Sequence, residues 1–389
     1  MNTLSKAKKV LVVGASIAGP ALCYWLKKFG FTPTLIEKNT TLREGGFPID
    51  IRGIAVDVVK KMGIYQKIVD KRTQLKSSYY IDSNGYLLSK SENEAVGFHQ
   101  DDDVEISRGD LADILMQCIS EIPCHFNQTV DRIVQHAESV EVTFKNGRVE
   151  YFDFVIGADG LHSSIRKIIF TNEEYNLFDL GSYISVFSVP NFLNLNHSEM
   201  IFERNQKLVH VSSDHKPSVA LVGFMFRSSE KLNDIRDKNE QKHFLKKSLC
   251  DLGWKTNELL QLMESSSDFY FDSIVQVKMK SWAKGRVALV GDAGYCPSPL
   301  SGQGTSLALV GAYILAGELK AANENYAVAF ARYNTLLRPF AESNQHFGLW
   351  ASESFLLPDE ASKHAVESRV NTIMEKLQRV SNAIALPKY

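Results

Sequence analysis

A loop of small residues near the start of the sequence has the spacing of a phosphate-binding turn. The apolar run Val10–Val13 leads into Gly14-Ala15-Ser16-Ile17-Ala18-Gly19, and apolar residues then recur at helical spacing. In a GxGxxG loop the glycines make a tight turn, let the backbone approach a pyrophosphate and pack the helix on the strand. Ser16 replaces the second glycine, but it is small, and its hydroxyl can donate to a phosphate. The loop predicts a pyrophosphate site at Gly14, Ser16, Ile17, Ala18 and Gly19, with helix packing alone as the alternative.

An acidic residue follows at the distance expected of a ribose ligand. Glu37 ends the next apolar run, Thr32–Glu37, 23 positions after Gly14. An acid at this place accepts hydrogen bonds from adenosine ribose hydroxyls and disfavours a 2′-phosphate there. The pattern therefore favours FAD or NAD over NADP as the tightly held nucleotide, and we add the neighbouring Lys38 to the candidate site. The alternative is that Glu37 is a solvated charge at the end of a strand.

Two further turns later in the chain carry acidic residues beside glycine. Asp159-Gly160 follows the run FDFVIG, although Asp-Gly is by itself a common turn dipeptide. Gly291-Asp292 follows RVALV and leads through a loop rich in Pro and Gly into an uncharged helix. There Asp292 could bind the sugar-alcohol chain of a flavin, and backbone amides near Gly302, Gln303 and Gly304 could face its ring edge.

Taken together, the three turns resemble those of the group A flavoprotein monooxygenases, the aromatic-hydroxylase family of FAD enzymes. The match lies in their order and spacing over nearly three hundred residues, and it adds Asp159 and Gly160 to the candidate cofactor-binding residues. By position, the resemblance implies that Glu37 binds the adenosine ribose, that Arg108 contacts the pyrophosphate or ribityl region and that Asp292 binds the ribityl hydroxyls. It further implies that Pro299 to Gly304 border the isoalloxazine and that Arg52 lies near the flavin ring or the NADPH route. Where family members often carry His, this chain has Tyr295 and then Cys296.

Longer segments resemble one subgroup, the tetracycline destructases that carry an additional C-terminal helix. These segments are GGFPIDIRGIA (45–55), SRGDL, GFMFRS (223–228), YCPSPLSGQG and SESFLLPD (352–359). The resemblance implies that NADPH reduces FAD, that O2 adds to give a C4a-hydroperoxide, and that an oxygen atom passes to a tetracycline. It implies no side-chain nucleophile and no metal. Rival hypotheses are an aromatic-compound or biosynthetic hydroxylase, a flavin-bound protein that sequesters the drug, and an NAD-dependent dehydrogenase.

Candidate substrate contacts lie on two strand-like runs in the middle of the chain. In SVALVGFMFRS, Phe224 and Phe226 share one strand face while Met225 lies on the other, so only one set can meet a ligand. Arg227 could pair with a polar enolate edge, and His210 in KLVHVSS is a further candidate. For each of these four residues a structural role is the alternative.

The elements that position these residues follow from the hydrophobic pattern. Lys6, Lys8 and Lys9 precede an uncharged run of 17 residues, 10–26, which resembles a signal peptide. Its glycines and its change of period instead favour a strand, turn and helix. We expect further strands at 139–144, 149–156, 183–189, 207–213 and 218–228 and from 286, with helices at 17–29, 110–119, 234–249, 305–317 and 369–385 and breaks at Pro339 and Pro358.

Length and composition fit an ordinary globular protein of several domains. The 389 residues carry 44 Lys plus Arg against 45 Asp plus Glu, which argues against nucleic-acid binding. Five scattered cysteines argue against a disulfide framework and favour a cytoplasmic location. We expect an α/β protein, α+β overall, that is a monomer without membrane association. We assign 1–75, 105–170 and 280–320 to a Rossmann-like FAD-binding domain, 76–104 and 171–279 to a mixed-sheet substrate domain, and 321–389 to C-terminal helices with a possible lid.

Overall fold

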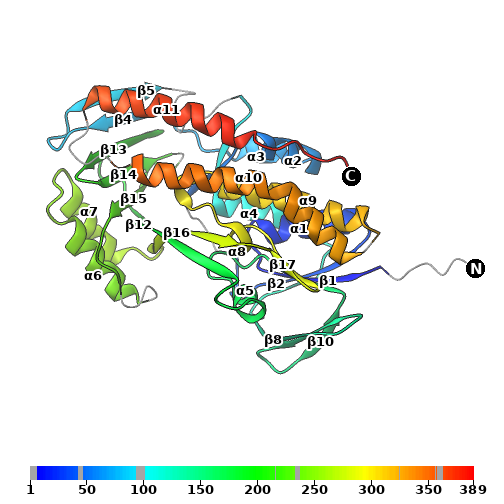
Figure 1. Ribbon diagram of the computed structural model, residues 1–389. Helices are drawn as coiled ribbons and strands as arrows, with labels where there is room; N and C mark the ends of the chain where they lie inside the picture. Colours follow the sequence, from blue (N-terminus) through cyan, green and yellow to red (C-terminus); the bar gives the residue numbers. More distant parts are fainter. Residues whose placement is uncertain are drawn as a thin grey trace, which may run out of the picture.

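A computed structural model describes most of the chain, with short gaps. The described residues are 7–42, 47–92, 101–214, 216–232, 237–323, 325–354, 356 and 362–389. Pro358 and parts of the segments 45–55, 234–249 and 352–359 lie outside them. Two large sheets stand at opposite ends of the molecule, and long helices from the last third of the chain run between them (Figure 1). The fold is mixed α/β, as the hydrophobic pattern predicts.

The first sheet is built on a parallel core that is buried on both faces. Its central strand, β1, pairs in parallel with β2 on one side and β11 on the other. Val10, Leu11 and Val12 of β1 are fully buried, which explains why this run is continuously apolar rather than alternating. In sheet order the strands are β17 (Ala283–Lys284), β18 (Val287–Leu289), β11 (Phe154–Gly157), β1 (Lys9–Val13), β2 (Thr32–Ile36) and β7 (Cys124–His125).

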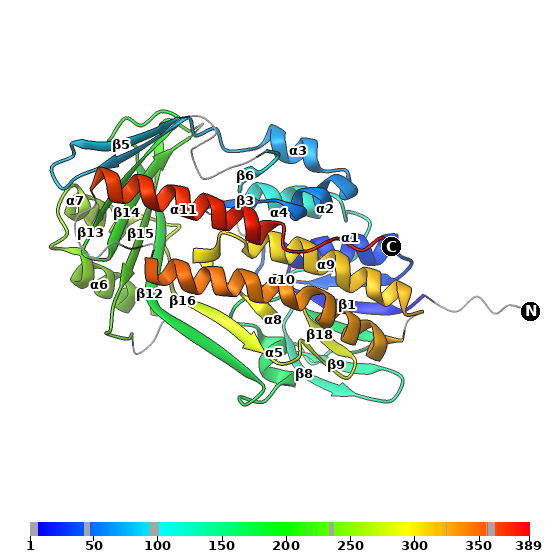
Figure 2. The ribbon, with the colours of Figure 1, turned by 45° about the horizontal axis from the view of Figure 1, so that its top comes forward.

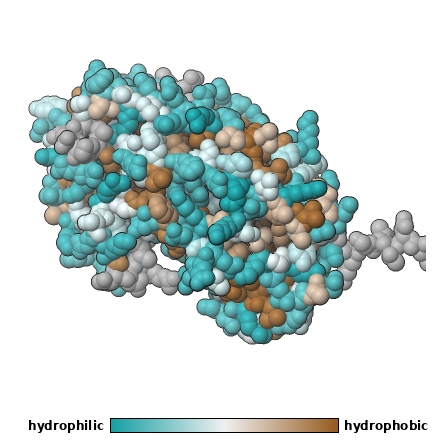
Figure 3. Space-filling model, viewed as in Figure 1, coloured by the Kyte–Doolittle hydropathy of each residue, from teal (hydrophilic) through white to brown (hydrophobic). Residues whose placement is uncertain are grey.

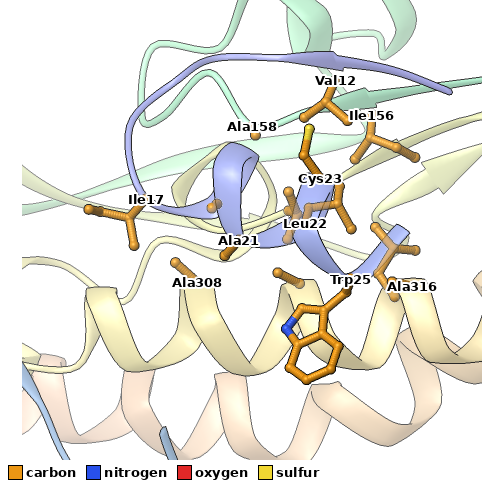
Figure 4. Packing of buried hydrophobic residues seen from close by; sticks show 14 of the residues in the cluster. Val12, Ile17, Ala21, Leu22, Cys23, Trp25, Ile156, Ala158, Ala308 and Ala316 are labelled. Atoms are coloured by element: carbon orange, nitrogen blue, oxygen red, sulfur yellow. The ribbon is translucent and has the colours of Figure 1, made fainter. Parts of the chain in front are cut away.

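Helix α1 (Ala18–Lys28) is held between this sheet and helix α9 (Gly304–Ala321). Figure 4 shows Leu22 and Cys23 of α1 turned toward Val12 and Ile156 of the sheet, while Ala21 meets Ala308 of α9. The small side chains let the two helices approach closely. The N-terminal run that resembles a signal peptide is therefore β1, the glycine turn and α1, packed inside the molecule.

The second large sheet is mostly antiparallel and has two different faces. One face packs against α6 (Lys238–Leu249) and α7 (Thr256–Leu262) through an aromatic core that includes Phe187 and Phe244. The other face is turned toward the rest of the molecule (Figure 2). In sheet order the strands are β16 (Tyr270–Met279), β12 (Tyr175–Pro190), β15 (Val219–Arg227), β14 (Lys207–Ser213), β13 (Ser198–Arg204), β4 (Ser77–Ile81) and β5 (Leu87–Glu92).

Two smaller sheets and several helices complete the described fold. Strands β3 (Pro48–Ile51) and β6 (Val104–Ser107) pair with each other, and a separate antiparallel sheet forms from β10, β9 and β8. The bounds of the remaining elements are β8 Val130–Gln135, β9 Val140–Phe144, β10 Val149–Phe152, α2 Ile54–Met62, α3 Tyr65–Asp70, α4 Arg108–Gln117, α5 Ser164–Ile169, α8 Asp292–Tyr295, α10 Tyr326–Ser354, α11 Lys363–Ser381 and the 3₁₀ turns η2 Met263–Ser265 and η3 Pro299–Ser301.

Three expectations about elements are wrong in detail. The single strand expected at 149–156 is two strands in different sheets, because the chain turns at Asp153, whose carboxylate accepts from the Lys9 amide. Helix α10 continues through Pro339, which lies on the exposed side, where water can satisfy the carbonyl that loses its partner. The last helix begins at Lys363 and ends at Ser381, earlier at both ends than expected.

The described surface is mostly polar, and the described cysteines are reduced. The face in Figure 3 is mostly hydrophilic, with apolar residues in small separate groups. All five cysteines are unpaired. Among the described residues, no helix combines the length and the apolar character needed to cross a bilayer, and no cluster of His, Cys, Asp and Glu could hold a metal ion.

Candidate functional site

The turn after β1 can be formed only with glycine at its two ends. Gly14 has φ of +110°, and a Cβ there would lie 2.5 Å from the Ala158 carbonyl oxygen. A Cβ on Gly19 would lie 1.9 Å from the Gly14 carbonyl oxygen. Among the described residues, no side chain caps the start of α1, so the first-turn amides after Ile17 and Ala18 keep their capacity to bind an anion.

Glu37 lies directly beside this turn. Its carboxylate accepts from the Ala15 amide at 2.9 Å and from the Asn39 backbone and side-chain nitrogens at 3.0 and 2.7 Å. The half-buried carboxylate thereby fixes the phosphate turn and stands at its rim. Lys38 is exposed. On the other side of the turn, Arg108 donates to the Ser16 hydroxyl at 2.7 Å, so a cation from α4 reaches the position expected to hold a phosphate.

In the second turn, Asp159 holds a helix in place. Its carboxylate accepts from the Ser164 amide at 2.7 Å, from the Ser164 hydroxyl at 2.8 Å and from the Ile165 amide at 3.1 Å. It thereby satisfies the first amides of α5, whose N-cap is Ser163. Gly160 has φ of +77° with open space beside it. The structure therefore places Asp159 and Gly160 next to the Gly14 turn, with the Asp159 side chain engaged in its own loop.

Arg166 is a residue of this region that the sequence analysis did not assign. It is fully buried and donates to the carbonyls of Ala293 at 2.8 Å and Leu161 at 2.6 Å. It thus joins the Asp159 turn to α8, where the third turn lies. The sequence gives only a weak signal for this buried cation, because Arg166 follows Ile165 but precedes the charged Lys167.

The third turn brings an acidic side chain to the start of α9. Gly291 has φ of +66° and leads into Asp292, and a Cβ on Gly304 would lie 3.9 Å from Asp292 Oδ1. Burial raises the pKa of Asp292, against the opposing effects of a hydrogen bond with Cys296 and the charge of Arg108. A buried carboxylate with a raised pKa is typical of a ligand-binding position.

The loop before α9 contains a buried side-chain amide that has no hydrogen-bond partner in the described part of the chain. Both polar atoms of the Gln303 side chain are buried and have no hydrogen bond to the described residues, and no side chain caps α9. Pro299 is exposed, and the exposed Gly302 has φ of +60°. Because a buried unpaired amide costs free energy, this loop is suited to a polar ring with donors and acceptors along its edge.

Arg52 is held by two carboxylates beside this loop. The side chain is buried, 2.9 Å from Asp50 and 3.5 Å from Asp103, and its backbone amide donates to the Ser306 hydroxyl of α9 at 3.2 Å. It therefore joins β3 to the segment before β6 and to the first turn of α9. These contacts give it a positioning role, next to the loop that the sequence analysis assigned to the flavin ring.

The three turns fit a dinucleotide that ends in a flavin: amide donors and Arg108 suit a pyrophosphate, Asp292 suits a polyol, and Gln303 suits a polar ring edge. The sequence model of the FAD binding domain family matches residues 7–344. The chain is also 55% identical over 386 residues, 99% of both chains, to the flavin-dependent monooxygenase of Legionella longbeachae. This chain belongs to the flavin-dependent monooxygenases.

Solved structures agree with this family. The chain is similar to the tetracycline destructase Tet(55), with a TM-score of 0.94, 55% identity and coverage of 98% of this chain and 99% of the other. For the tetracycline destructase Tet(51) the TM-score is 0.91, with 54% identity over 99% and 100% of the two chains. The R204Q variant of Klebsiella pneumoniae HpxO complexed with FAD shares the fold at 19% identity and a TM-score of 0.74, over 95% and 94% of the chains.

A cavity of about 300 Å³ lies between the second sheet and the β3–β6 ribbon of this monooxygenase. The side of β15 that carries Leu221, Gly223 and Met225 faces it. Phe47 closes it from the β3 side and Val370 from α11. The volume is at the lower end of the range for small-molecule sites, and most of its wall is apolar.

The structure changes the set of substrate contacts expected on β15. Phe226 is fully buried and stacks on Tyr183 in the core under α6. This placement, away from the cavity, does not support the prediction that it meets substrate. Phe224 borders the cavity, but it is 1% exposed and its ring packs on Phe187. The alternation of a half-buried strand sends the aromatic face inward, and Met225 lies on the cavity side.

Arg227 does not line the cavity either. The residue ends β15, and its guanidinium donates to the Ser352 carbonyl near the end of α10 at 2.9 Å. It therefore fixes α10 against the second sheet. The pairing with a substrate enolate that the sequence suggested is not supported by this placement.

His210 is the one predicted substrate residue whose side chain meets the cavity as a polar group. Its Nε2 lies 2.7 Å from Glu199 Oε2 of the neighbouring strand. Burial alone would lower the pKa of His210, but the hydrogen bond and charge of Glu199, with the charge of Glu105, raise it above its usual value. Neither glutamate could be singled out from the sequence, because each lies far along the chain from the strand-face pattern of β15.

Helix α11 covers the open side of the cavity. Val366 and Val370 pack with Tyr80, Leu88 and Ile201 of the second sheet. Close by, Arg369 forms an ion pair of 2.7 Å with Glu203, and both side chains are nearly fully buried. Figure 2 shows the helix running from the second sheet to the region of α2. This placement suits a helix that helps to keep solvent out of the cavity.

Proposed function

We propose that this monooxygenase oxidatively inactivates tetracyclines, with NADPH as the reductant of FAD and O2 as the co-substrate. The observation that carries the proposal is the similarity over nearly the whole chain, above 50% identity, to two solved tetracycline destructases. FAD, when bound, supplies the electron transfer and the oxygen activation. The chain's own residues bind the cofactor, orient the substrate and exclude water.

The cofactor-binding residues act mainly through hydrogen bonds and dipoles. The Gly14 turn and the start of α1 would hold the pyrophosphate, with Arg108 at its side, and Glu37 would accept from the ribose. Asp292 would accept from the ribityl hydroxyls. The Gln303 amide and the start of α9 would stabilise negative charge at the polar edge of the ring.

The substrate cavity would protect the reaction from water. Its apolar wall on β15 and the cover by α11 leave the polar groups at one end, near His210. Exclusion of water strengthens the remaining electrostatic contacts in the site. It also limits side reactions of the activated oxygen with water. We further propose the discontinuous domain layout given above, and a monomer that acts in the cytoplasm, a location supported by five unpaired cysteines.

The test is turnover by the purified FAD-loaded protein. With NADPH and O2, tetracycline should lose its long-wavelength absorbance while NADPH is consumed in a substrate-dependent manner. No change across several tetracyclines would overturn the assignment and favour a hydroxylase for another aromatic compound. Tight binding without NADPH consumption would instead identify a sequestering protein.

A further inference from the structure

The loop before α9 contains a serine in a backbone conformation that is otherwise almost confined to glycine. Ser298, the residue before η3, has φ of +79° and ψ of 156°. A Cβ crowds the backbone in this region, so a residue other than glycine persists there where the surrounding structure holds it. Ser298 is 2% exposed and is thus enclosed by protein. Its neighbours must therefore supply the contacts that maintain the strained shape of the loop.

A buried glutamine of β16 holds the carbonyl that precedes Ser298. The side-chain amide of Gln276 donates to the Pro297 carbonyl at 3.1 Å and to the backbone carbonyl of Gln345 in α10 at 2.6 Å. Gln276 is fully buried, so water does not compete for either bond. One amide group thus joins the loop to the second sheet and to α10.

A second amide, from α10, holds the carbonyl one residue earlier. The side-chain nitrogen of Gln345 donates to the Cys296 carbonyl at 3.3 Å and to the Val277 carbonyl of β16 at 2.8 Å. The Val277 backbone amide also donates to the Cys296 carbonyl, at 3.1 Å. The carbonyls of Cys296 and Pro297 are therefore fixed by β16 and α10, two elements that are distant in sequence.

These bonds restrict both backbone dihedrals of Ser298. The Pro297 carbonyl and the Ser298 amide belong to one planar peptide group, so the bond from Gln276 limits rotation in φ. On the other side, the Ser298 carbonyl accepts from the Ser301 amide at 3.2 Å and from the Ser301 hydroxyl at 2.9 Å, which limits rotation in ψ. The strained conformation is thus held from both of its ends.

Close packing of α10 adds to this restraint. A Cβ on Gly348 would collide with the Pro297 carbonyl oxygen and lie 2.9 Å from the Ser298 hydroxyl. Its distance to the Gln276 side-chain nitrogen would be 3.2 Å. Residue 348 must therefore be small for α10 to reach the loop, and the loop has little room to move toward the helix.

We propose that Gln276 and Gln345 are positioning residues of this monooxygenase, which clamp Ser298 in its strained conformation and so present Pro299–Gly304 to the flavin ring. The inference rests on the proposed function in one respect, because the placement of the ring at this loop is part of it. The glutamines act through the loop, and their own side chains are committed to backbone carbonyls.

The clamp would serve the cofactor in two ways. A loop that already has its bound shape loses little conformational freedom when FAD binds, which favours affinity. Donors held at a fixed place, such as the Gln303 amide and the start of α9, also stabilise negative charge on the ring better than donors that must reorganise. The strain at Ser298 is then the energetic cost of a preorganised loop.

The experiment uses FAD-loaded proteins that differ in the clamp, in the strained residue or in both. The variants are Gln276→Met, Ser298→Gly, the double variant of these two, and Gln345→Met. The control is Asn344→Leu, which removes another fully buried amide of α10, one that donates to the Phe340 carbonyl of its own helix. Flavin fluorescence on dilution gives the FAD dissociation constant, a redox titration gives the reduction potential of the bound flavin, and thermal unfolding gives the stability.

The largest loss is expected when the clamp is removed and the strain is kept. Gln276→Met should raise the FAD dissociation constant about tenfold, because a buried carbonyl on the loop loses its donor and the loop relaxes. The reduction potential should become more negative. Gln345→Met should act in the same direction with a smaller effect, since the Cys296 carbonyl keeps its bond from the Val277 amide.

The double variant decides whether strain is what the clamp opposes. Because glycine adopts the φ of Ser298 at no steric cost, Ser298→Gly should return the dissociation constant of Gln276→Met to within about threefold of wild type, and the potential should follow. Asn344→Leu should lower the melting temperature but keep the dissociation constant within about twofold of wild type.

Three results would overturn the inference. They are an equal loss of FAD affinity in Gln276→Met with and without Ser298→Gly, unchanged affinity in both glutamine variants, and a tenfold loss in Asn344→Leu. If Gln276→Met yields no soluble protein, Gln345→Met with and without Ser298→Gly provides the same comparison. Each of these results leaves the proposed function standing if the wild type still oxidises tetracycline, whereas a wild type that retains no FAD would overturn both.

Discussion

The nucleotide site and the substrate cavity are built by different means. At the nucleotide site, we propose that backbone amides at the starts of α1 and α9 make most of the contacts, and Gly14 and Gly19 are needed because a Cβ at either would collide with backbone atoms. The substrate cavity is formed by side chains from strands distant in sequence and by a separate helix, α11. The first site tolerates little change, whereas the second can vary its side chains on a constant sheet.

The sharpest test of the rigid half of this comparison is Gly19→Ala. The added Cβ would lie 1.9 Å from the Gly14 carbonyl oxygen, so the turn must open, and FAD affinity should fall by about 100-fold or more, ~2.7 kcal/mol. Flavin absorbance of the purified protein measures the result. The control is Gly30→Ala, at positive φ with open space around it. It should lower the free energy of unfolding by about 1 kcal/mol and leave the flavin content of the purified protein unchanged. Full flavin content in Gly19→Ala would show that the turn is not rigid.

On the cavity side, Arg369→Leu should give the largest effect. It leaves the fully buried Glu203 without its ion-pair partner, and removal of one partner of a buried pair costs about 3–5 kcal/mol. Urea unfolding measures the loss. The double variant Arg369→Leu, Glu203→Leu should recover most of the stability, because no charge then remains buried. A double variant as unstable as the single one would show that the contribution is packing and not charge.

Asp292→Asn tests the acidic residue of the nucleotide site. In the protein without FAD, burial raises the pKa of Asp292, so the folded state holds the proton more tightly than the unfolded state. At low pH, where the Asp292 side chain is protonated in both states, it leaves the free energy of unfolding unchanged. As the pH rises from the pKa of the unfolded state to the higher pKa of the folded state, the buried carboxylate lowers the free energy of unfolding. At neutral pH we expect the apoprotein to melt a few degrees higher and FAD to bind about tenfold more weakly. A lower melting temperature for the Asp292→Asn apoprotein would contradict the view that the buried Asp292 carboxylate destabilises the protein without FAD.

The smallest effects should separate the two faces of β15. Phe226→Leu removes part of a fully buried ring and should cost about 1–2 kcal/mol of stability with little change in the KM for tetracycline. Met225→Ala, on the cavity side, should raise that KM severalfold with a smaller loss of stability. Thermal unfolding and steady-state kinetics distinguish them. The reverse pattern would place the substrate on the aromatic face.

The same difference explains what the sequence could predict. Gly14, Ser16 and Glu37 belong to one local βαβ unit, so strand, turn and helix could be inferred from spacing, and the structure shows them side by side. The two faces of β15 were also separable by alternation, with Met225 opposite Phe224 and Phe226. Which face meets the cavity depends on α6 and α7, elements that no local pattern relates to β15.

Other features needed the tertiary structure. Glu105, Glu199 and His210 meet only because β6 stands across from β13 and β14. Arg166 joins two turns that are more than 120 residues apart in sequence, through its bond to Ala293. The sequence predicts a helix break at Pro339, although α10 continues through it. Nothing in the sequence indicates that this side of α10 faces water.

The buried pair of Arg369 and Glu203 has a consequence for the effect of temperature on the helix that covers the cavity. The hydration of charged groups becomes less favourable on warming, so the desolvation penalty of a buried pair falls while the gain from apolar contacts levels off. The ion pair that fixes α11 to β13 should therefore gain in weight relative to the valine contacts beside it as the temperature rises. At high temperature this one pair would contribute a growing share of the free energy that holds α11 over the cavity.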